Sequence, residues 1–244
     1  MEITKGKWNK HLLMSRSPDL NFFLPETKKM MKHTFWGMLE KYGVIMAKPD
    51  QGCMGKGVIQ ISDKDNDKFL IHEEGNKEEI QGREETYTFL KKAMGKRKYI
   101  VQYWIPLATV GRQPFDIRVL VQRRKNSRKW VVTGQYAKVA HSGYIITNVV
   151  TNVHPVEEVM ESSSLQNISI PIAKLLRELE MLSLRTAKYI GKVNKRVRLI
   201  GLDMGIDHHG NLWIIEVNLR NPAIAPFRDM DRNVYRRILS YIKG

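Results

Sequence analysis

Two carboxylates near the C-terminal end of the chain are spaced so that they face each other across a hairpin. Residues 201–218 alternate between apolar and polar types on either side of a turn at residues 209–210. Pairing the residues outward from that turn places Asp203 directly opposite Glu216, with Asn218 on the same face of the sheet. The hairpin therefore predicts a small cluster of oxygen-bearing side chains.

The same register predicts the rest of the hairpin. It pairs Gly205 with Ile214 and Asp207 with Leu212, and a symmetric four-residue loop at 208–211 gives the same pairs. The face opposite the carboxylates then collects the apolar side chains of Leu202, Met204, Ile206, Trp213, Ile215 and Val217.

Facing carboxylates need a compensating charge or a shared proton. Two such groups about 5 Å apart repel by roughly 3 kcal/mol at an effective dielectric of 20, so Glu216→Gln alone is expected to leave the metal-free protein as stable or more stable. A lysine or arginine would offset the repulsion, and Mg²⁺ takes oxygen ligands of this kind, often together with phosphates. We predict a metal site at Asp203, Glu216 and Asn218; the alternative is a solvent-facing pair whose side chains diverge.

A glycine loop follows a short strand that ends in lysine. Residues 48–57 read Lys-Pro-Asp-Gln-Gly-Cys-Met-Gly-Lys-Gly, and glycines let backbone N–H groups approach phosphates without a Cβ clash. Lys48, which we expect to be exposed at the strand end, can reach the same phosphates. The spacing matches neither the Walker A loop nor the kinase pattern. The alternative is a flexible hairpin turn beside a lysine.

Two cations are expected on a central hairpin formed by residues 115–123 and 130–139. Arg118 and Lys138 on neighbouring strands would neutralise charge that develops during phosphoryl transfer. Ordinary cross-strand pairing with Asp116 is the alternative for these side chains.

The elements that must position these residues follow from local patterns. Helices are expected at 27–42, 83–94 and 168–193, with a basic C-terminal helix from about residue 231. Strands are expected at 44–48, 58–61, 69–72 and 99–105, in addition to the two hairpins. We predict an α+β fold of two lobes, with a hinge near 102–106. The segments would be 1–43, an N-terminal arm and helix; 44–104, a small lobe with the glycine loop; and 105–244, a large lobe with the metal site.

The composition narrows the classes of protein. The 244 residues carry a formal charge of +16 and a single cysteine, which excludes an internal disulfide and a cysteine-based zinc cluster. No apolar run approaches the ~20 residues of a membrane span, and the N-terminus has no signal-peptide pattern, so we expect a cytoplasmic protein. The charge predicts an anionic partner, either a phosphorylated or polycarboxylate substrate or nucleic acid. No nucleic-acid motif is present, so only the charge supports nucleic acid as the partner. The oligomeric state stays open.

Taken in order, these motifs resemble the ATP-grasp superfamily, and within it the YheC/YheD-like group described as endospore coat-associated. The matching segments are 8–10 (Trp-Asn-Lys), 24–27 (Leu-Pro-Glu-Thr), the glycine loop, 114–122, 130–134, and the carboxylate hairpin. The resemblance implies two lobes of mainly antiparallel sheet with helices, with ATP between them and Mg²⁺ as cofactor. Typical members phosphorylate a carboxylate, and an amine or thiol then attacks the acyl-phosphate. It also suggests an association with spores.

The resemblance implies a role for each matching position. Phosphate contacts would come from Lys48 and Lys138, and from a mobile loop containing Gln51, Gly52, Gly55, Lys56 and Gly57. The adenine slot would be lined, largely by backbone groups, at Gln102, Tyr103, Trp104 and Ile105. Arg118 would touch phosphate or acyl-phosphate, Arg220 would anchor an anionic substrate, and Asp203, Glu216 and Asn218 would bind Mg²⁺.

Two departures from the family pattern concern the second substrate. Only about forty residues precede Lys48, so the separate N-terminal domain of many ATP-grasp enzymes is expected to be absent or minimal. Asn148 lies in an expected active-site loop that lacks a Gly-Gly pair.

A carboxylate–amine or carboxylate–thiol ligase is favoured. An ATP-dependent kinase, a non-catalytic basic coat scaffold and a nucleic-acid-binding protein remain as alternatives.

Overall fold

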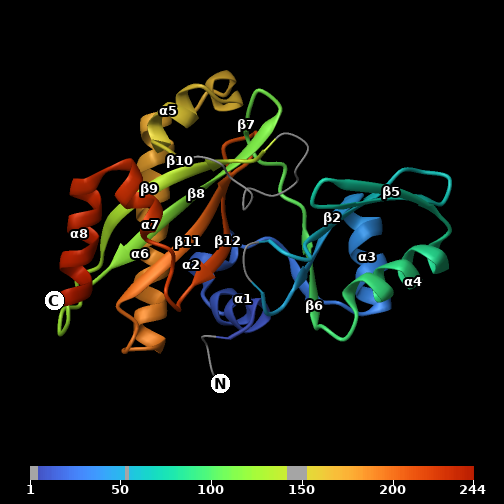
Figure 1. The fold of residues 1–244 in the computed structure, drawn as a ribbon, viewed down its shortest axis with the longest axis horizontal. Helices are drawn as coiled ribbons and strands as arrows, with labels where there is room; N and C mark the ends of the chain where they lie inside the picture. Colours follow the sequence, from blue (N-terminus) through green and yellow to red (C-terminus); the bar gives the residue numbers. More distant parts are fainter. Residues whose placement is uncertain (1–4, 53–54, 142–152) are drawn as a thin grey trace.

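The computed structural model of the protein describes residues 5–52, 55–141 and 153–244, and it shows two lobes side by side (Figure 1). The smaller lobe is an antiparallel sheet in the order β1-β6-β2-β3-β4-β5. Its strands are β1 (Thr27–Lys29), β2 (Val44–Pro49), β3 (Ile59–Asp63), β4 (Lys68–Glu73), β5 (Asn76–Gln81) and β6 (Tyr99–Tyr103). Helices α3 (Lys32–Tyr42) and α4 (Arg83–Met94) bury Phe35, Leu39 and Leu90 in a core with Ile45 and Ile61 of the sheet.

The larger lobe is a second antiparallel sheet in the order β10-β9-β8-β11-β12, with β7 paired to β8. Its strands are β7 (Thr109–Val110), β8 (Gln113–Gln122), β9 (Val131–Val139), β10 (Val153–His154), β11 (Leu199–Ile206) and β12 (Leu212–Asn218). The helices are α5 (Val156–Glu161), α6 (Ile172–Val193), α7 (Ala225–Met230) and α8 (Arg232–Lys243), with a 3₁₀ turn at Ser164–Asn167. None of the helices in the described ranges combines the length and apolar character needed to cross a bilayer.

Side-chain alternation along β8 divides the larger lobe into two layers. Val119 and Val121 enter the main core under α6, whereas Leu120 packs with Phe227 and Ile238 of α7 and α8 on the other face. Strand geometry sends successive side chains to opposite faces, so Arg118 shares the face of Leu120. That face carries the charged residues of β8 toward the smaller lobe.

The N-terminal segment contributes to both lobes. Helices α1 (Lys7–Ser15) and α2 (Pro18–Asn21) place Met14 and Leu20 in the core of the larger lobe. The backbone N–H of Ile214 in β12 donates to the carbonyl of Phe23 at 2.8 Å. A few residues later the chain enters the smaller sheet as β1. The division of the chain at 43/44 and 104/105 stays a prediction.

Most expected elements are confirmed, but the helices expected at 27–42 and 168–193 begin later than predicted, and several short elements, β5 among them, were not predicted. The predicted helix at 27–42 is wrong in its first turn, because residues 27–29 pair with β6 as an edge strand and α3 begins only at Lys32. Thr34 closes the start of α3: its hydroxyl accepts from the N–H of Met31 at 3.0 Å. Strand β5 was not predicted, because five of its six side chains are exposed and it has no apolar alternation. Helix α4 has the predicted bounds.

Candidate active site

A cavity of about 460 Å³ lies between the two lobes. One end is mainly apolar and is lined by Met46, Val58, Tyr103, Trp104, Ile105, Leu107 and Ile215. The other end is charged and is lined by Lys48, Asp116, Arg118, Lys138, Asp203, Glu216 and Asn218. The fold thus brings together a pocket suited to a flat apolar ring and a cluster suited to anions and cations.

The predicted pairing of Asp203 with Glu216 across β11 and β12 is confirmed. The pairing nearer the turn is wrong: Gly205 pairs with Trp213, not Ile214, and Leu212 pairs with Ile206, not Asp207. The turn is tighter than expected, because the N–H of Asp207 already donates to the carbonyl of Asn211 at 3.0 Å.

Two local features explain the shifted register. Gly210, at φ +86°, supplies the left-handed residue that a three-residue hairpin loop needs. A register shift next to Asp203 then restores the predicted pairs further from the turn. As a result Ile214 is buried in the core, whereas Ile215, predicted to face the core, lines the cavity.

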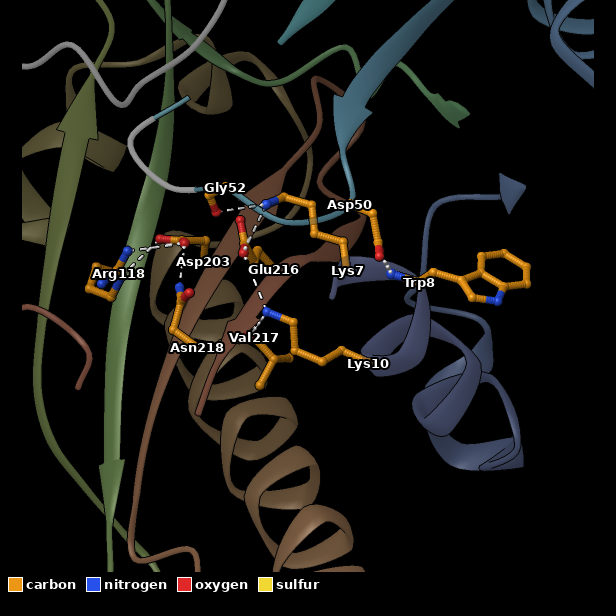
Figure 2. A network of polar contacts seen from close by, with 10 residues as sticks. All are labelled: Lys7, Trp8, Lys10, Asp50, Gly52, Arg118, Asp203, Glu216, Val217 and Asn218. Atoms are coloured by element: carbon orange, nitrogen blue, oxygen red, sulfur yellow. Dashed lines mark hydrogen bonds and ion pairs between the residues drawn. The ribbon is translucent and has the colours of Figure 1, made fainter. Parts of the chain in front are cut away.

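Asp203 is the centre of the charged cluster. Its Oδ1 accepts from Arg118 Nε at 2.8 Å and from Lys138 Nζ at 3.1 Å. Its Oδ2 accepts from Arg118 Nη2 at 3.0 Å and from Asn218 Nδ2 at 3.1 Å (Figure 2). Burial alone would raise the pKa of Asp203, but Lys138 and Arg118 outweigh it and hold that pKa below its usual range.

Lys138 is shared between two carboxylates. Its Nζ lies 2.8 Å from Asp116 Oδ1 and 3.1 Å from Asp203 Oδ1. Burial would lower the pKa of Lys138, but Asp116 and Asp203 raise it above its usual range. The cross-strand pairing considered for Asp116 therefore exists, and it holds Lys138 at the wall of the cavity.

Glu216 is compensated by two lysines from the N-terminal helix. Lys7 Nζ and Lys10 Nζ each lie 3.4 Å from Glu216 Oε1, and Lys10 also donates to the carbonyl of Val217 at 2.6 Å (Figure 2). Lys7 and Lys10 were not predicted at this site, because they lie 206 or more positions from Glu216 and the match at residues 8–10 gave Lys10 no role.

These ion pairs correct the expectation for Glu216→Gln. The repulsion between Asp203 and Glu216 is already offset by four cationic side chains, two at each carboxylate. Neutralising Glu216 removes both ion pairs with α1. The ammonium groups of Lys7 and Lys10 then lie near each other without the carboxylate that compensates their charge. The metal-free variant is therefore expected to be less stable, not more.

Lys48 enters the cavity from β2 and is held by Gln102. Its Nζ donates to Gln102 Oε1 at 2.6 Å, and Gln102 Nε2 donates to Thr27 Oγ1 at 2.8 Å. The expectation that Lys48 is exposed is wrong: it is half-buried, and burial lowers its pKa to about 8. Gln102 lines the cavity, as predicted, and its side chain also positions Lys48, while the neighbouring Tyr103 and Trp104 line the apolar end.

The glycine loop lies over the charged end. Gly52, Gly55 and Lys56 line the cavity, whereas Gln51 lines a neighbouring pocket. Gly57 is not among the residues that line the cavity. It adopts φ +75°, and its carbonyl accepts from the Tyr99 hydroxyl at 3.0 Å. Cys53 and Asn148 lie outside the described residues.

Arg220 lies just beyond β12, where the cavity meets the neighbouring pocket. It lines both of them, as Asn218 does. All three residues predicted to hold a metal, and all three predicted to act on the substrate, therefore line one cavity.

The donor set fits Mg²⁺ in its chemistry. Asp203, Glu216 and Asn218 present carboxylate and amide oxygens from adjacent positions of β11 and β12. Within the described ranges no three His, Cys, Asp or Glu side chains form a metal-binding group. A metal site here would need the Asn218 amide oxygen as its third donor, and Mg²⁺ would share the carboxylates with the lysines and arginine already bound to them.

The sequence matches the YheC/D-like ATP-grasp family over residues 2–243. It is 24% identical over 224 residues to the endospore coat-associated protein YheD of Bacillus subtilis (strain 168). That match covers 88% of this chain and 48% of YheD, so the chain spans about half the length of this curated relative.

Solved structures of several enzymes share the fold. The N5-carboxyaminoimidazole synthetase of Staphylococcus aureus, complexed with ADP, superposes with a TM-score of 0.63 at 10% identity, covering 100% of this chain and 52% of that one. Biotin carboxylase of Campylobacter jejuni has a TM-score of 0.61 at 12% identity, covering 97% and 45%. D-alanyl-alanine synthetase A of Vibrio cholerae has a TM-score of 0.57 at 12% identity, covering 99% and 64%. The chain has the ATP-grasp fold and belongs to the YheC/D-like ATP-grasp family.

Proposed function

We propose that the protein is an ATP- and Mg²⁺-dependent ligase that activates a carboxylate as an acyl-phosphate for attack by an amine or a thiol. The observation that carries the proposal is the interlobe cavity that joins an apolar end to a cluster of three cations and three oxygen-bearing side chains. The synthetases and the carboxylase that share this fold support it.

In this proposal the two ends of the cavity divide the nucleotide between them. The adenine ring lies among the apolar side chains, next to the backbone of residues 103–105. Lys48, Lys138 and Arg118 face the phosphates, where positive charge stabilises the transferred phosphoryl group. Gly52 and Gly55 let the loop backbone approach the same phosphates.

Asp203, Glu216 and Asn218 would hold Mg²⁺, which supplies charge neutralisation and orientation of the γ-phosphate. The chain's own contribution is preorganisation. The bidentate contact of Arg118 with Asp203 and the placement of Lys138 between two carboxylates fix both cations before a ligand arrives. Preorganised charges avoid a reorganisation cost during reaction.

The proposed chemistry has two steps. A carboxylate oxygen of the substrate attacks the γ-phosphorus of ATP, the bond to the β-phosphate oxygen breaks, and ADP leaves. An amine or thiol then attacks the acyl carbon, inorganic phosphate leaves, and the nucleophile loses its proton. Arg118 and Arg220 lie where they can hold the negative charge of the acyl-phosphate and of the substrate.

ADP release tests this proposal directly. We expect Mg²⁺-dependent ADP release that requires a carboxylate, and hydroxylamine should trap the acyl-phosphate as a hydroxamate. Asp203→Asn should lower the rate by at least about a hundredfold, because one carboxylate is lost from the metal and phosphate cluster. Glu178→Gln, in an exposed pair on α6, is the charge-matched control.

Two results would contradict the ligase. ADP release with a phosphorylated alcohol as product and no hydroxamate would assign a kinase. No ADP release across carboxylates, amino acids and peptides, together with normal folding, would favour a non-catalytic protein.

The relative's coat association motivates a separate proposal, that this protein too is associated with spores.

A further inference from the structure

A second pocket of about 200 Å³ opens beside the cavity, where α1 begins. Its charged lining consists of Lys5, Lys7, Lys10 and Arg220, together with Asp50 and Glu216. Lys7, Glu216 and Arg220 also line the nucleotide cavity, so the two spaces share a wall. A molecule in the second pocket can therefore reach the charged end of the first.

The charge of this pocket is positive, with four cationic side chains against two carboxylates. One of the carboxylates, Asp50, is already committed to α1: its Oδ1 accepts from the N–H of Trp8 at 2.8 Å, and its carbonyl accepts from the N–H of Lys7 at 2.8 Å (Figure 2). The other, Glu216, is the proposed metal ligand. Binding of a divalent cation would raise the positive charge of the pocket further.

Lys7 and Lys10 line this pocket and are largely shielded from water. Their side chains are only 15% and 12% exposed. Both contacts of Lys7 Nζ with described residues, to the carbonyl of Gly52 and to Glu216 Oε1, are 3.4 Å long. Charge-assisted hydrogen bonds are usually 2.7–2.9 Å. The ammonium group is therefore largely removed from water yet not closely bound, an arrangement that favours an incoming anion.

We propose that this pocket binds a second carboxylate of the substrate, so that the enzyme acts on a molecule with at least two carboxylates. This inference rests on the proposed function: the carboxylate to be activated lies at the shared wall near Asn218 and Arg220, and the second lies among Lys5, Lys7 and Lys10. The class is a dicarboxylate, either small or at the end of an acidic peptide.

Succinate and butyrate, which have the same number of carbons, test the second carboxylate. Calorimetric titration is expected to show succinate binding about tenfold more tightly than butyrate, with and without a non-hydrolysable ATP analogue. Lys10→Gln should remove most of that difference, because Lys10 lines the second pocket and not the nucleotide cavity. A tri-glutamate peptide, run alongside, separates a small dicarboxylate from an acidic chain end.

Exposed variants keep the test independent of folding. Lys5 is exposed and lines only the second pocket, so Lys5→Glu should lower succinate affinity by about fivefold or more. Arg16→Glu makes the same change in charge at the opposite end of α1, in an exposed residue, and should leave succinate binding unchanged.

The outcomes separate this inference from the proposed function. Equal binding of succinate and butyrate, or equal succinate binding in the wild type, Lys5→Glu and Lys10→Gln, would overturn the inference even if the ATP analogue binds. Lysine-dependent succinate binding without any binding of the analogue would instead contradict the proposed function and support the pocket.

Discussion

Charge compensation within the chain dominates this site at the scale of single residues. Each carboxylate of the facing pair carries two cationic partners, with Arg118 and Lys138 on Asp203 and two α1 lysines on Glu216. Lys48, by contrast, has a neutral partner in Gln102 and has its pKa lowered to about 8 by burial. The charge of Lys48 therefore responds to pH near neutrality.

Lys48 makes the affinity for nucleotide depend on pH. Below pH 8 its ammonium is charged and can pair with phosphate; above pH 8 it loses the proton. The affinity of the wild type for a non-hydrolysable ATP analogue should fall about tenfold between pH 7 and 9. Lys48→Arg should remove that dependence, since arginine stays charged. Calorimetric titration across this range is the measurement.

The stability of the protein provides the control for this prediction. Unfolded Lys48 keeps its proton up to about pH 10.5, whereas the folded residue loses it at about 8. The unfolded state binds more protons in that window, so the contribution of Lys48 to stability rises with pH while nucleotide affinity falls. An affinity that stays flat from pH 7 to 9 in the wild type would remove Lys48 from the phosphate site.

At the scale of elements, the sequence predicts what local patterns determine. The amphipathic helix α6 and the bounds of α4 can be predicted because their apolar residues recur at helical spacing. Strand β1 cannot be predicted in this way, because Thr27–Lys29 forms a strand only by pairing with β6. The irregularity in β12 is likewise invisible, since it depends on the tight turn at Gly210.

Two helical glycines test the packing of these elements. Gly37 in α3 has no atom within 4 Å of an added Cβ, so Gly37→Ala should stabilise the protein by about 0.5–1 kcal/mol through helix propensity. At Gly191 in α6 an added Cβ would lie 2.9 Å from the buried ring of Trp130. Gly191→Ala should therefore destabilise by up to about 2 kcal/mol despite the same gain in propensity.

Denaturant unfolding of the two variants measures the difference. Each variant is the other's control, because both add one methyl group to a helix. Equal stabilisation by both changes would show that α6 does not pack against Trp130 as described.

At the scale of the whole molecule, the N-terminal segment ties the lobes together. Helix α1 contacts Asp50 at the end of β2 and Glu216 in β12, so residues from both lobes and from the start of the chain meet at one site (Figure 2). The carboxylate hairpin, the glycine loop and the cations of β8 and β9 were predictable, since each carries a local motif. The lysines of α1 were not, because only the folded chain brings residues 7 and 10 to Glu216.

Part of the net charge of +16 is located at the proposed binding site. Lys7 and Arg220 line both the cavity and the second pocket, and Lys48 and Arg118 line the cavity. A cleft lined by one sign of charge raises the local concentration of an oppositely charged substrate. The nucleotide and the polycarboxylate that we propose as ligands would account for this part of the charge without nucleic acid.

The central claim is that Mg²⁺ and nucleotide bind together between the lobes, through Glu216 and its neighbours. The most direct test is calorimetric titration of a non-hydrolysable ATP analogue into the wild type and Glu216→Gln, with Mg²⁺ and with EDTA. Glu84→Gln, whose exposed side chain pairs with Lys32 on the smaller lobe, is the matched control.

We predict that Mg²⁺ strengthens binding to the wild type and to Glu84→Gln by at least about tenfold, because the ion links the phosphates to the carboxylates. In Glu216→Gln that gain should fall below about threefold, while binding in EDTA stays equal or improves, since Lys7, which lines the same cavity, is released toward the phosphates. An undiminished gain from Mg²⁺ in Glu216→Gln, or no binding to the wild type at millimolar nucleotide, would contradict the account.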